Sequence, residues 1–152
     1  MSALFKKLNL KDQTAIVVLQ APASFETALA ELKGVTVHRK VARGAKIAFG
    51  IGFAIRQTEL DAVSASLIAA ADGDAVVWIA YPKQSSKKYT CEFHRDSGWT
   101  VLADAGFETV RMVAIDDDWS ALRFRRVEYV KAMKRAPEHA VTAAGKKRAR
   151  TA

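Results

Sequence analysis

Two short, almost uninterrupted apolar runs constrain the fold of this chain more than any other feature. They are Thr14-Ala-Ile-Val-Val-Leu19 and Ala75-Val-Val-Trp-Ile-Ala80. Runs of this length without polar alternation are typical of strands that are covered on both faces, as in a parallel sheet between two helical layers. The second run follows the turn Asp72-Gly73-Asp74 and leads into Tyr81-Pro82-Lys83, so turn residues bound it on both sides.

The rest of the chain alternates between strand and helix patterns. Further strands are predicted at residues 35–38, 45–52, 108–115 and 121–127, and helices at residues 2–8, 25–32, 56–71, 90–105 and 128–135. Ser2 and Ser24 are the expected caps of the first two helices. The pattern predicts a three-layer, Rossmann-like α/β domain with a mostly parallel sheet that ends in an antiparallel β-hairpin. Residues 1–135 are expected to form this single domain, and residues 136–152 a flexible basic tail rich in Ala, Lys and Arg.

The direction of the second strand stays open at this stage. The gap from Arg39 to Gly44 is too short for a crossover helix. Either an extended segment carries the chain back across the sheet, or the second strand is an antiparallel edge.

Three segments carry a resemblance to a known family. They are Trp78-Ile-Ala-Tyr-Pro-Lys83, Arg95-Asp-Ser-Gly-Trp99 and Val113-Ala-Ile-Asp-Asp-Asp-Trp-Ser-Ala-Leu-Arg-Phe124. The chain from Leu8 to Val127 resembles an uncharacterised bacterial family catalogued as domain of unknown function 3052, and Asp118–Arg123 is the most specific block. More broadly, the closing half resembles class I methyltransferase-like domains. The resemblance implies a small cytosolic α/β domain and brings no catalytic residues to carry over.

Composition limits the compartment and the partners. Half of the 152 residues are hydrophobic, and Cys91 is the single cysteine. No apolar run reaches the roughly 18 residues that a membrane span needs, and the first residues lack the apolar stretch of a secretory signal. We therefore expect a cytoplasmic protein without membrane contact.

The formal net charge of +8 is uneven along the chain. From Lys131 onward seven basic residues face Glu138 alone, whereas 17 basic and 15 acidic residues precede Lys131. The tail, with Lys146-Lys-Arg-Ala-Arg150, could neutralise about four phosphates and give weak, salt-sensitive contact with nucleic acid. A solubilising terminus is an equally good interpretation.

The signals for a nucleotide-type cofactor are missing, so no cofactor is expected. Gln20-Ala21-Pro22-Ala23 has no glycine after the first strand, and His38-Arg39-Lys40 offers no acidic residue for a ribose at the end of the second. Methyltransferase-like sites usually need the same two features, so binding of S-adenosylmethionine is not expected. Gly50-Ile51-Gly52 lacks a third glycine and is interpreted as a packing feature.

The residues that we single out as a candidate ligand site lie in two basic loops at the carboxyl edge of the predicted sheet. Two such loops that meet beside a helix start could hold a small anionic ligand such as a phosphate or carboxylate. Simple solvation of both loops is the alternative. The residues are Arg39, Lys40 and Arg43 from one loop, Lys83, Ser85, Ser86, Lys87 and Lys88 from the other, and Trp119, which could stack on a ligand.

Other candidate chemistry is weaker, and no catalytic or metal-binding residue is assigned. Asp116, Asp117 and Asp118 could bind Mg²⁺, but at least one of them is expected to cap the hairpin turn or to pair with the neighbouring lysines. Cys91 and His94 lie three residues apart on a predicted helix and are interpreted as packing residues. The arginines of the last strand, at positions 123, 125 and 126, are expected to guard a sheet edge.

Taken together, these features lead us to expect a cytosolic, non-catalytic binding or regulatory domain. One alternative is a divergent S-adenosylmethionine-dependent methyltransferase-like enzyme. A second alternative is a nucleic-acid accessory protein that acts through the basic tail. The oligomeric state is left open.

Overall fold

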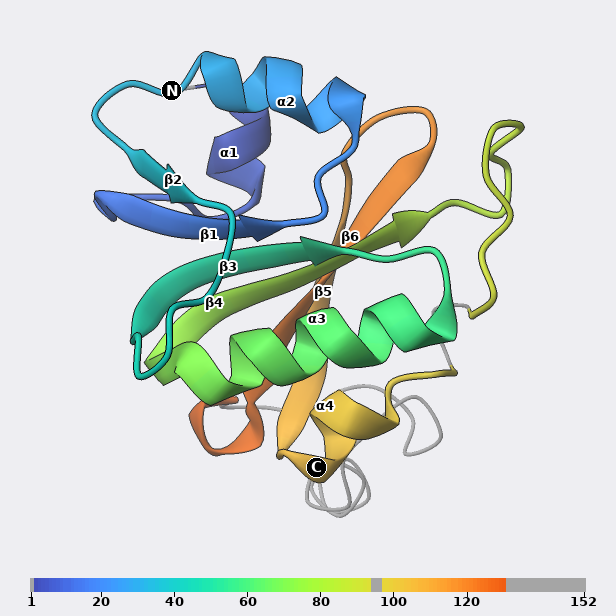
Figure 1. Cartoon of the computed structure of the whole chain (residues 1–152). Helices are drawn as coiled ribbons and strands as arrows, with labels where there is room; N and C mark the ends of the chain where they lie inside the picture. Colours follow the sequence, from blue (N-terminus) through green and yellow to red (C-terminus); the bar gives the residue numbers. More distant parts are fainter. Residues whose placement is uncertain (1, 94–96, 131–152) are drawn as a thin grey trace.

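The computed structural model describes residues 2–93 and 97–130. One six-stranded sheet forms the centre, in the order β2-β1-β3-β4-β6-β5 (Figure 1). From the amino terminus the elements are α1 (Ala3–Lys7), β1 (Ala15–Leu19), α2 (Ala23–Ala30), β2 (Thr36–His38), β3 (Ile47–Phe53), α3 (Gln57–Ala70), β4 (Ala71–Pro82), α4 (Thr100–Asp104), β5 (Phe107–Ala114), β6 (Trp119–Arg126) and the 3-10 helix η1 (Val127–Tyr129).

The sheet is parallel from β2 to β4 and antiparallel from β4 to β5. β1 pairs in parallel with β2 on one side and with β3 on the other, and β3 pairs in parallel with β4. β6 then pairs antiparallel with both β4 and β5. The predicted class, a mostly parallel α/β sheet that closes with an antiparallel hairpin, is confirmed.

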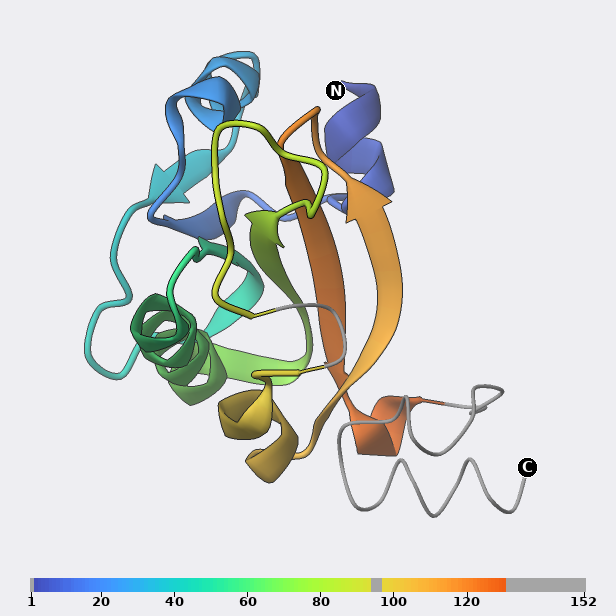
Figure 2. The same cartoon turned by 90° about the vertical axis from the view of Figure 1, so that its right-hand side faces the viewer.

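The second strand is parallel, which decides between the two alternatives left by the sequence. Residues 39–46 therefore carry the chain from the carboxyl end of β2 across β1 to the start of β3, and they do so without a helix. In Figures 1 and 2 this crossover lies on the same face of the sheet as α3.

A separate apolar cluster covers each face of the sheet. Residues of α1 and α2, such as Phe5 and Phe25, pack with Phe49 and Trp78 on one face. Residues of α3 and α4 pack with alternate strand positions on the other face, among them Leu67 and Leu102. This alternation explains why the strand runs read as almost continuously apolar.

Gly50 and Gly52 let α3 lie close to β3, as interpreted from the sequence. A Cβ atom on Gly50 would lie 2.7 Å from Leu67 Cδ2, and one on Gly52 would lie 2.9 Å from Val63 Cβ. Both distances are too short for real contacts, so any larger residue would push α3 away from the sheet.

The helix predicted at residues 90–105 is wrong over most of its length. Of the residues described in this region, 90–93 and 97–105, only those of α4 (Thr100–Asp104) are helical. Gly98 has a φ of +94°, a conformation that ends a helix, and it follows a loop in which Phe93 packs at 5.9 Å from Tyr81 between ring centroids. Tertiary packing of these aromatic rings replaces the local helix. The predicted helix at residues 128–135 falls mostly outside the described residues, and η1 occupies its first part.

The turn predicted at Asp72-Gly73-Asp74 is an irregular part of β4. The register shifts between the pairs Ile47–Ala71 and Phe49–Val76, so the residues between Ala71 and Val76 form a bulge. Arg125 donates two hydrogen bonds to the Asp74 carboxylate at 2.7 and 2.6 Å, and Arg126 donates to the Gly73 and Ala71 carbonyls. These contacts fasten the irregular segment to β6.

The arginines of β6 do not guard an edge, contrary to expectation, because β6 lies between β4 and β5. Two edge strands bound the sheet, β2 and β5. Within the described residues, no helix is both long and apolar enough to span a bilayer.

Candidate functional site

The topology creates a switch point at the carboxyl end of β1. After β1 the chain turns through α2 to β2 on one side, and it then crosses over to β3 on the other side. In open α/β sheets, ligands bind in the crevice outside the carboxyl ends of two strands that diverge in this way. The segments that surround this edge are the Gln20–Ser24 turn, the loop after β3, the loop after β4 and the hairpin turn between β5 and β6 (Figure 1).

The turn after β1 has a glycine-like backbone although it contains no glycine. Gln20 has a φ of +59°, in the left-handed region that non-glycine residues seldom adopt. The sequence provides no signal for this conformation. An exposed glutamine side chain therefore stands where the backbone conformation would favour glycine.

The amino end of α2 carries no side-chain cap. The expectation that Ser24 caps this helix is wrong: Pro22 occupies the N-cap position, and α2 already begins at Ala23. The amides of Phe25 and Glu26 both donate to the Pro22 carbonyl, at 3.0 and 3.2 Å. The Ala23 and Ser24 amides form no hydrogen bond within the described residues, and the Asp116 carboxylate that accepts the Ser24 hydroxyl lies beside this first turn.

An acidic side chain lies at the end of β2, although the sequence there contains none. Glu26 of α2 forms an ion pair with Arg39, the residue that follows β2. Both side chains are about half exposed. A carboxylate therefore lies beside the residue that follows β2, and it comes from the neighbouring helix, which sequence position alone could not reveal.

A polar network closes the top of the carboxyl edge. Ser24 Oγ donates to Asp116 Oδ2 at 3.0 Å, and Asp116 Oδ1 accepts from the amides of Asp118 and Trp119, both at 2.9 Å. Ser86 Oγ donates to Asp118 Oδ1 at 2.8 Å. The prediction that an aspartate caps the hairpin turn is confirmed for Asp116. Among the described residues, no three carboxylate, imidazole or thiol groups are arranged to share a metal ion.

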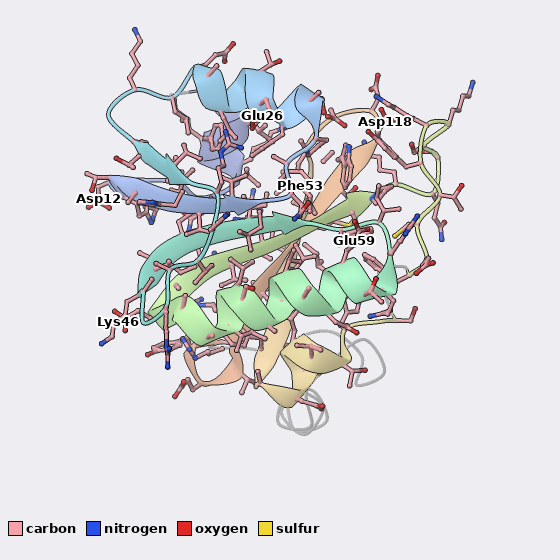
Figure 3. The ribbon with its side chains drawn as sticks, in the orientation of Figure 1. Asp12, Glu26, Lys46, Phe53, Glu59 and Asp118 are labelled. Carbon is pink, nitrogen blue, oxygen red and sulfur yellow. The ribbon has the colours of Figure 1, made fainter. Side chains whose placement is uncertain are left out.

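A row of aromatic rings lies beneath this network. Ring centroids are separated by 4.8 Å for Phe25–Phe53, 5.3 Å for Phe53–Trp119 and 5.1 Å for Tyr89–Trp119. Figure 3 places Phe53 at the end of β3, between the labelled Glu26 and Glu59. Trp119 is buried in this row, so its ring packs within the fold rather than presenting an open face to a ligand.

The two basic loops proposed as an anion site lie over different parts of the sheet. They follow β2 and β4, and β1 and β3 lie between those strands. Arg39 is paired with Glu26, Lys40 lies on the crossover, and Arg43 is exposed further along it. In the other loop, Lys87 and Lys88 are exposed, Ser85 is exposed and Ser86 is engaged with Asp118, while Lys83 donates its amide to the Asp118 carbonyl at 2.8 Å.

The helix start nearest to the lysine-rich loop is already occupied. Glu59 Oε1 accepts from the amides of Ile55 and Arg56, at 3.2 and 2.8 Å, and Glu92 Oε1 accepts from Gln57 at 2.9 Å. Two carboxylates therefore lie at the amino end of α3 and accept hydrogen bonds from three successive amides, which disfavours an additional anion there. Binding of an anion by these two loops remains a prediction.

A cavity of about 770 Å³ lies beneath the loop that follows β4. Aromatic and apolar side chains, Tyr81, Phe93 and Met112, line it together with Lys83 and Glu92. Cys91 also lines this cavity, and burial raises the pKa of its thiol. Cys91 lies in a loop and not on the helix predicted for it, and His94 lies outside the described residues.

These features define an open, doubly wound α/β domain with a switch point between β1 and β3 and a cavity at the loop that follows β4. No protein-family model and no curated protein matches the sequence.

Solved structures, however, match the fold. A SAM-dependent methyltransferase from Aquifex aeolicus aligns with a TM-score of 0.56 at 13% identity, over 82% of this chain and 88% of that chain. A ribosomal protein L11 methylase from Lactobacillus delbrueckii subsp. bulgaricus aligns with a TM-score of 0.51 at 10% identity, over 81% and 76%.

The structural matches correct our functional expectation. The matched scaffolds are methyltransferases, which contradicts the interpretation of the chain as a non-catalytic binding or regulatory domain and favours the methyltransferase-like alternative. At this low identity the likeness establishes the methyltransferase-like fold itself.

Proposed function

We propose that this chain is a divergent methyltransferase-like enzyme that binds S-adenosylmethionine at the carboxyl ends of β1 and β3. The observation that carries the proposal is the switch point itself, in a sheet whose fold is shared with methyltransferases. When bound, S-adenosylmethionine supplies an electrophilic methyl group for transfer to a nucleophile.

The residues at this edge fit such a molecule at two points. The amides of Ala23 and Ser24 at the start of α2 would bind the carboxylate of the methionine moiety, because neither amide forms a hydrogen bond within the described residues. The Glu26 carboxylate would accept hydrogen bonds from the ribose hydroxyls, and Arg39 would keep it oriented. In this proposal, the start of α2 replaces the glycine-rich turn that is missing after β1, and Glu26 replaces the acidic residue that is missing at the end of β2.

The acceptor substrate would enter the cavity beneath the loop that follows β4. That cavity lies at the carboxyl end of β4. β4 is paired with β3, one of the two strands of the switch point. Its mixture of aromatic walls with Lys83 and Glu92 suits a small substrate that has both an apolar body and polar groups.

We further infer a cytoplasmic setting and membership of the family catalogued as domain of unknown function 3052. The single, half-buried cysteine supports a reducing compartment. The Asp118–Arg123 block, on which the family resemblance rests, forms the end of the hairpin turn and the first half of β6.

Calorimetric titration of the full chain with S-adenosylmethionine tests the proposed function. We expect saturable binding that weakens at least tenfold in Ala23→Glu, because a carboxylate at the start of α2 repels the bound carboxylate. Ala42→Glu is the matched control, since it adds the same charge on the crossover, away from the switch point. Absence of saturable binding to the unaltered chain, or equal weakening in both variants, would refute the proposal.

A further inference from the structure

The crossover between the parallel strands β2 and β3 is unusually short and contains no helix. Such a connection normally contains a dozen or more residues and a helix that packs on the sheet. Here eight residues, 39–46, make it without helix. The space over β1 and the start of β3, which a helix would otherwise fill, is a cavity of about 480 Å³.

The floor and the roof of this cavity are apolar. Val17 of β1 and Ile47 of β3 belong to the cluster on the α3 face and are 3% and 9% exposed. Val41 of the crossover packs against the same cluster. The crossover then turns back at Ala42, whose carbonyl accepts from the Ala45 amide at 3.0 Å. A ligand with an apolar body would therefore find contacts both on the sheet and on the crossover.

The rim of the cavity is basic. Lys40 and Lys46 line it and are exposed, and neither forms an ion pair with any described residue. His38 and Asp12 are the other titratable groups of the lining. Figure 3 shows Asp12 and Lys46 at the end of the sheet opposite to Phe53. Two lysines against one aspartate favour a ligand with negative charge.

We propose that this cavity binds a small amphiphilic anion, with an apolar, ring-sized body against Val17, Val41 and Ile47 and a carboxylate or sulfonate held by Lys40 and Lys46. The volume lies within the usual range of small-molecule sites, about 300 to 1,000 Å³. The site is separate from the switch point, because it lies over the first half of β1 and the first residues of β3. It does not depend on the proposed methyltransferase function.

Fluorescence titration of the full chain with 8-anilinonaphthalene-1-sulfonate tests this proposal. We expect saturable binding at one site, weakened about five- to tenfold in the double variant Lys40→Gln/Lys46→Gln. Lys6→Gln/Lys7→Gln is the matched control, because it removes the same charge from exposed positions of α1. The control variant should bind within twofold of the unaltered chain. N-phenyl-1-naphthylamine has the same apolar body without the sulfonate and should bind all three proteins equally.

Methyl NMR locates the probe independently of any substitution. Saturating 8-anilinonaphthalene-1-sulfonate should shift the methyl signals of Val17, Val41 and Ile47 and leave those of Val113 and Leu102 unchanged. The proposal is overturned by the absence of saturable binding, by equal weakening in both double variants, or by methyl shifts confined to other residues.

Discussion

Gln20 holds a backbone conformation that suits glycine better than glutamine. Its φ of +59° places Cβ close to the following carbonyl, at a cost of roughly 1–2 kcal/mol. Gln20→Gly removes this cost, and the larger chain entropy of glycine in the unfolded state offsets part of the gain. We expect a free energy of unfolding about 1 kcal/mol higher, measured by urea denaturation.

Gln84→Gly is the matched control for this substitution. Gln84 is exposed in the loop after β4. Unlike Gln20, it is not one of the described residues that have a positive φ. Here glycine only adds unfolded-state entropy, so the free energy of unfolding should stay the same or fall. A destabilised Gln20→Gly variant would show that the turn does not strain its glutamine.

Cys91 is expected to react slowly with alkylating reagents at neutral pH. Burial raises the pKa of its thiol, the backbone hydrogen bond from Phe93 opposes this change, and the charge of Glu92 adds to it. Because the thiolate is the reactive form, less of it is present in the folded chain than in an unfolded one. Mass spectrometry after iodoacetamide treatment should show slower labelling in buffer than in denaturing urea, with the folded rate rising only at higher pH. Equal rates in both solvents would contradict this.

At the scale of elements, the sequence predicted most of the strands correctly. Its predictions of helices were wrong where contacts between distant residues determine the local structure. The runs at 14–19 and 75–80 identified β1 and the second half of β4 because burial on both faces leaves a local signature. The region around Phe93 and Trp99 lacks such a signature, because both rings pack against Tyr81, a tertiary contact that local spacing does not predict. The start of α2 was misplaced because Ser24 binds Asp116, 92 positions away, in place of its own helix.

The candidate site was less predictable than the fold for the same reason. The sequence correctly indicates that β1 ends without glycine and β2 without an acid. It cannot show that Glu26 reaches Arg39 from α2, or that Gln20 adopts a left-handed conformation. Both features depend on how α2 packs against the sheet. The basic loops were grouped on the assumption of a shared edge, while the strand order separates them by two strands.

The hairpin turn between β5 and β6 depends on one carboxylate. Asp116 accepts two backbone amides of its own turn and the hydroxyl of Ser24. Asp116→Ala leaves these three donors without their acceptor and should lower the free energy of unfolding by about 1–2 kcal/mol. Asp117→Ala is the matched control, since Asp117 is exposed in the same turn, and it should change stability by less than about 0.5 kcal/mol. Equal effects of the two substitutions would show that the cap does not stabilise the hairpin.

At the scale of the whole molecule, the two apolar clusters and the six-stranded sheet are built from residues up to 130 in the part of the chain that the structure describes. Removal of residues 136–152 should therefore leave the melting temperature within about 2 °C of that of the full chain, because the described residues of both clusters are kept. A larger drop would show that the predicted domain boundary at residue 135 is wrong. The measurement is thermal unfolding followed by circular dichroism.

The same truncation tests the predicted contact between the tail and nucleic acid. Residues 136–152 contain four basic residues and one acidic residue, whereas the chain before Lys131 is close to electrical balance. Each neutralised phosphate contributes about 0.9 to the slope of log K against log salt concentration on duplex DNA. The full chain should therefore show a slope about 3 to 4 units steeper than the truncated chain in fluorescence anisotropy across a salt series. Equal slopes would assign any DNA affinity to the folded domain, where exposed basic side chains include those of the crossover and of the loop after β4.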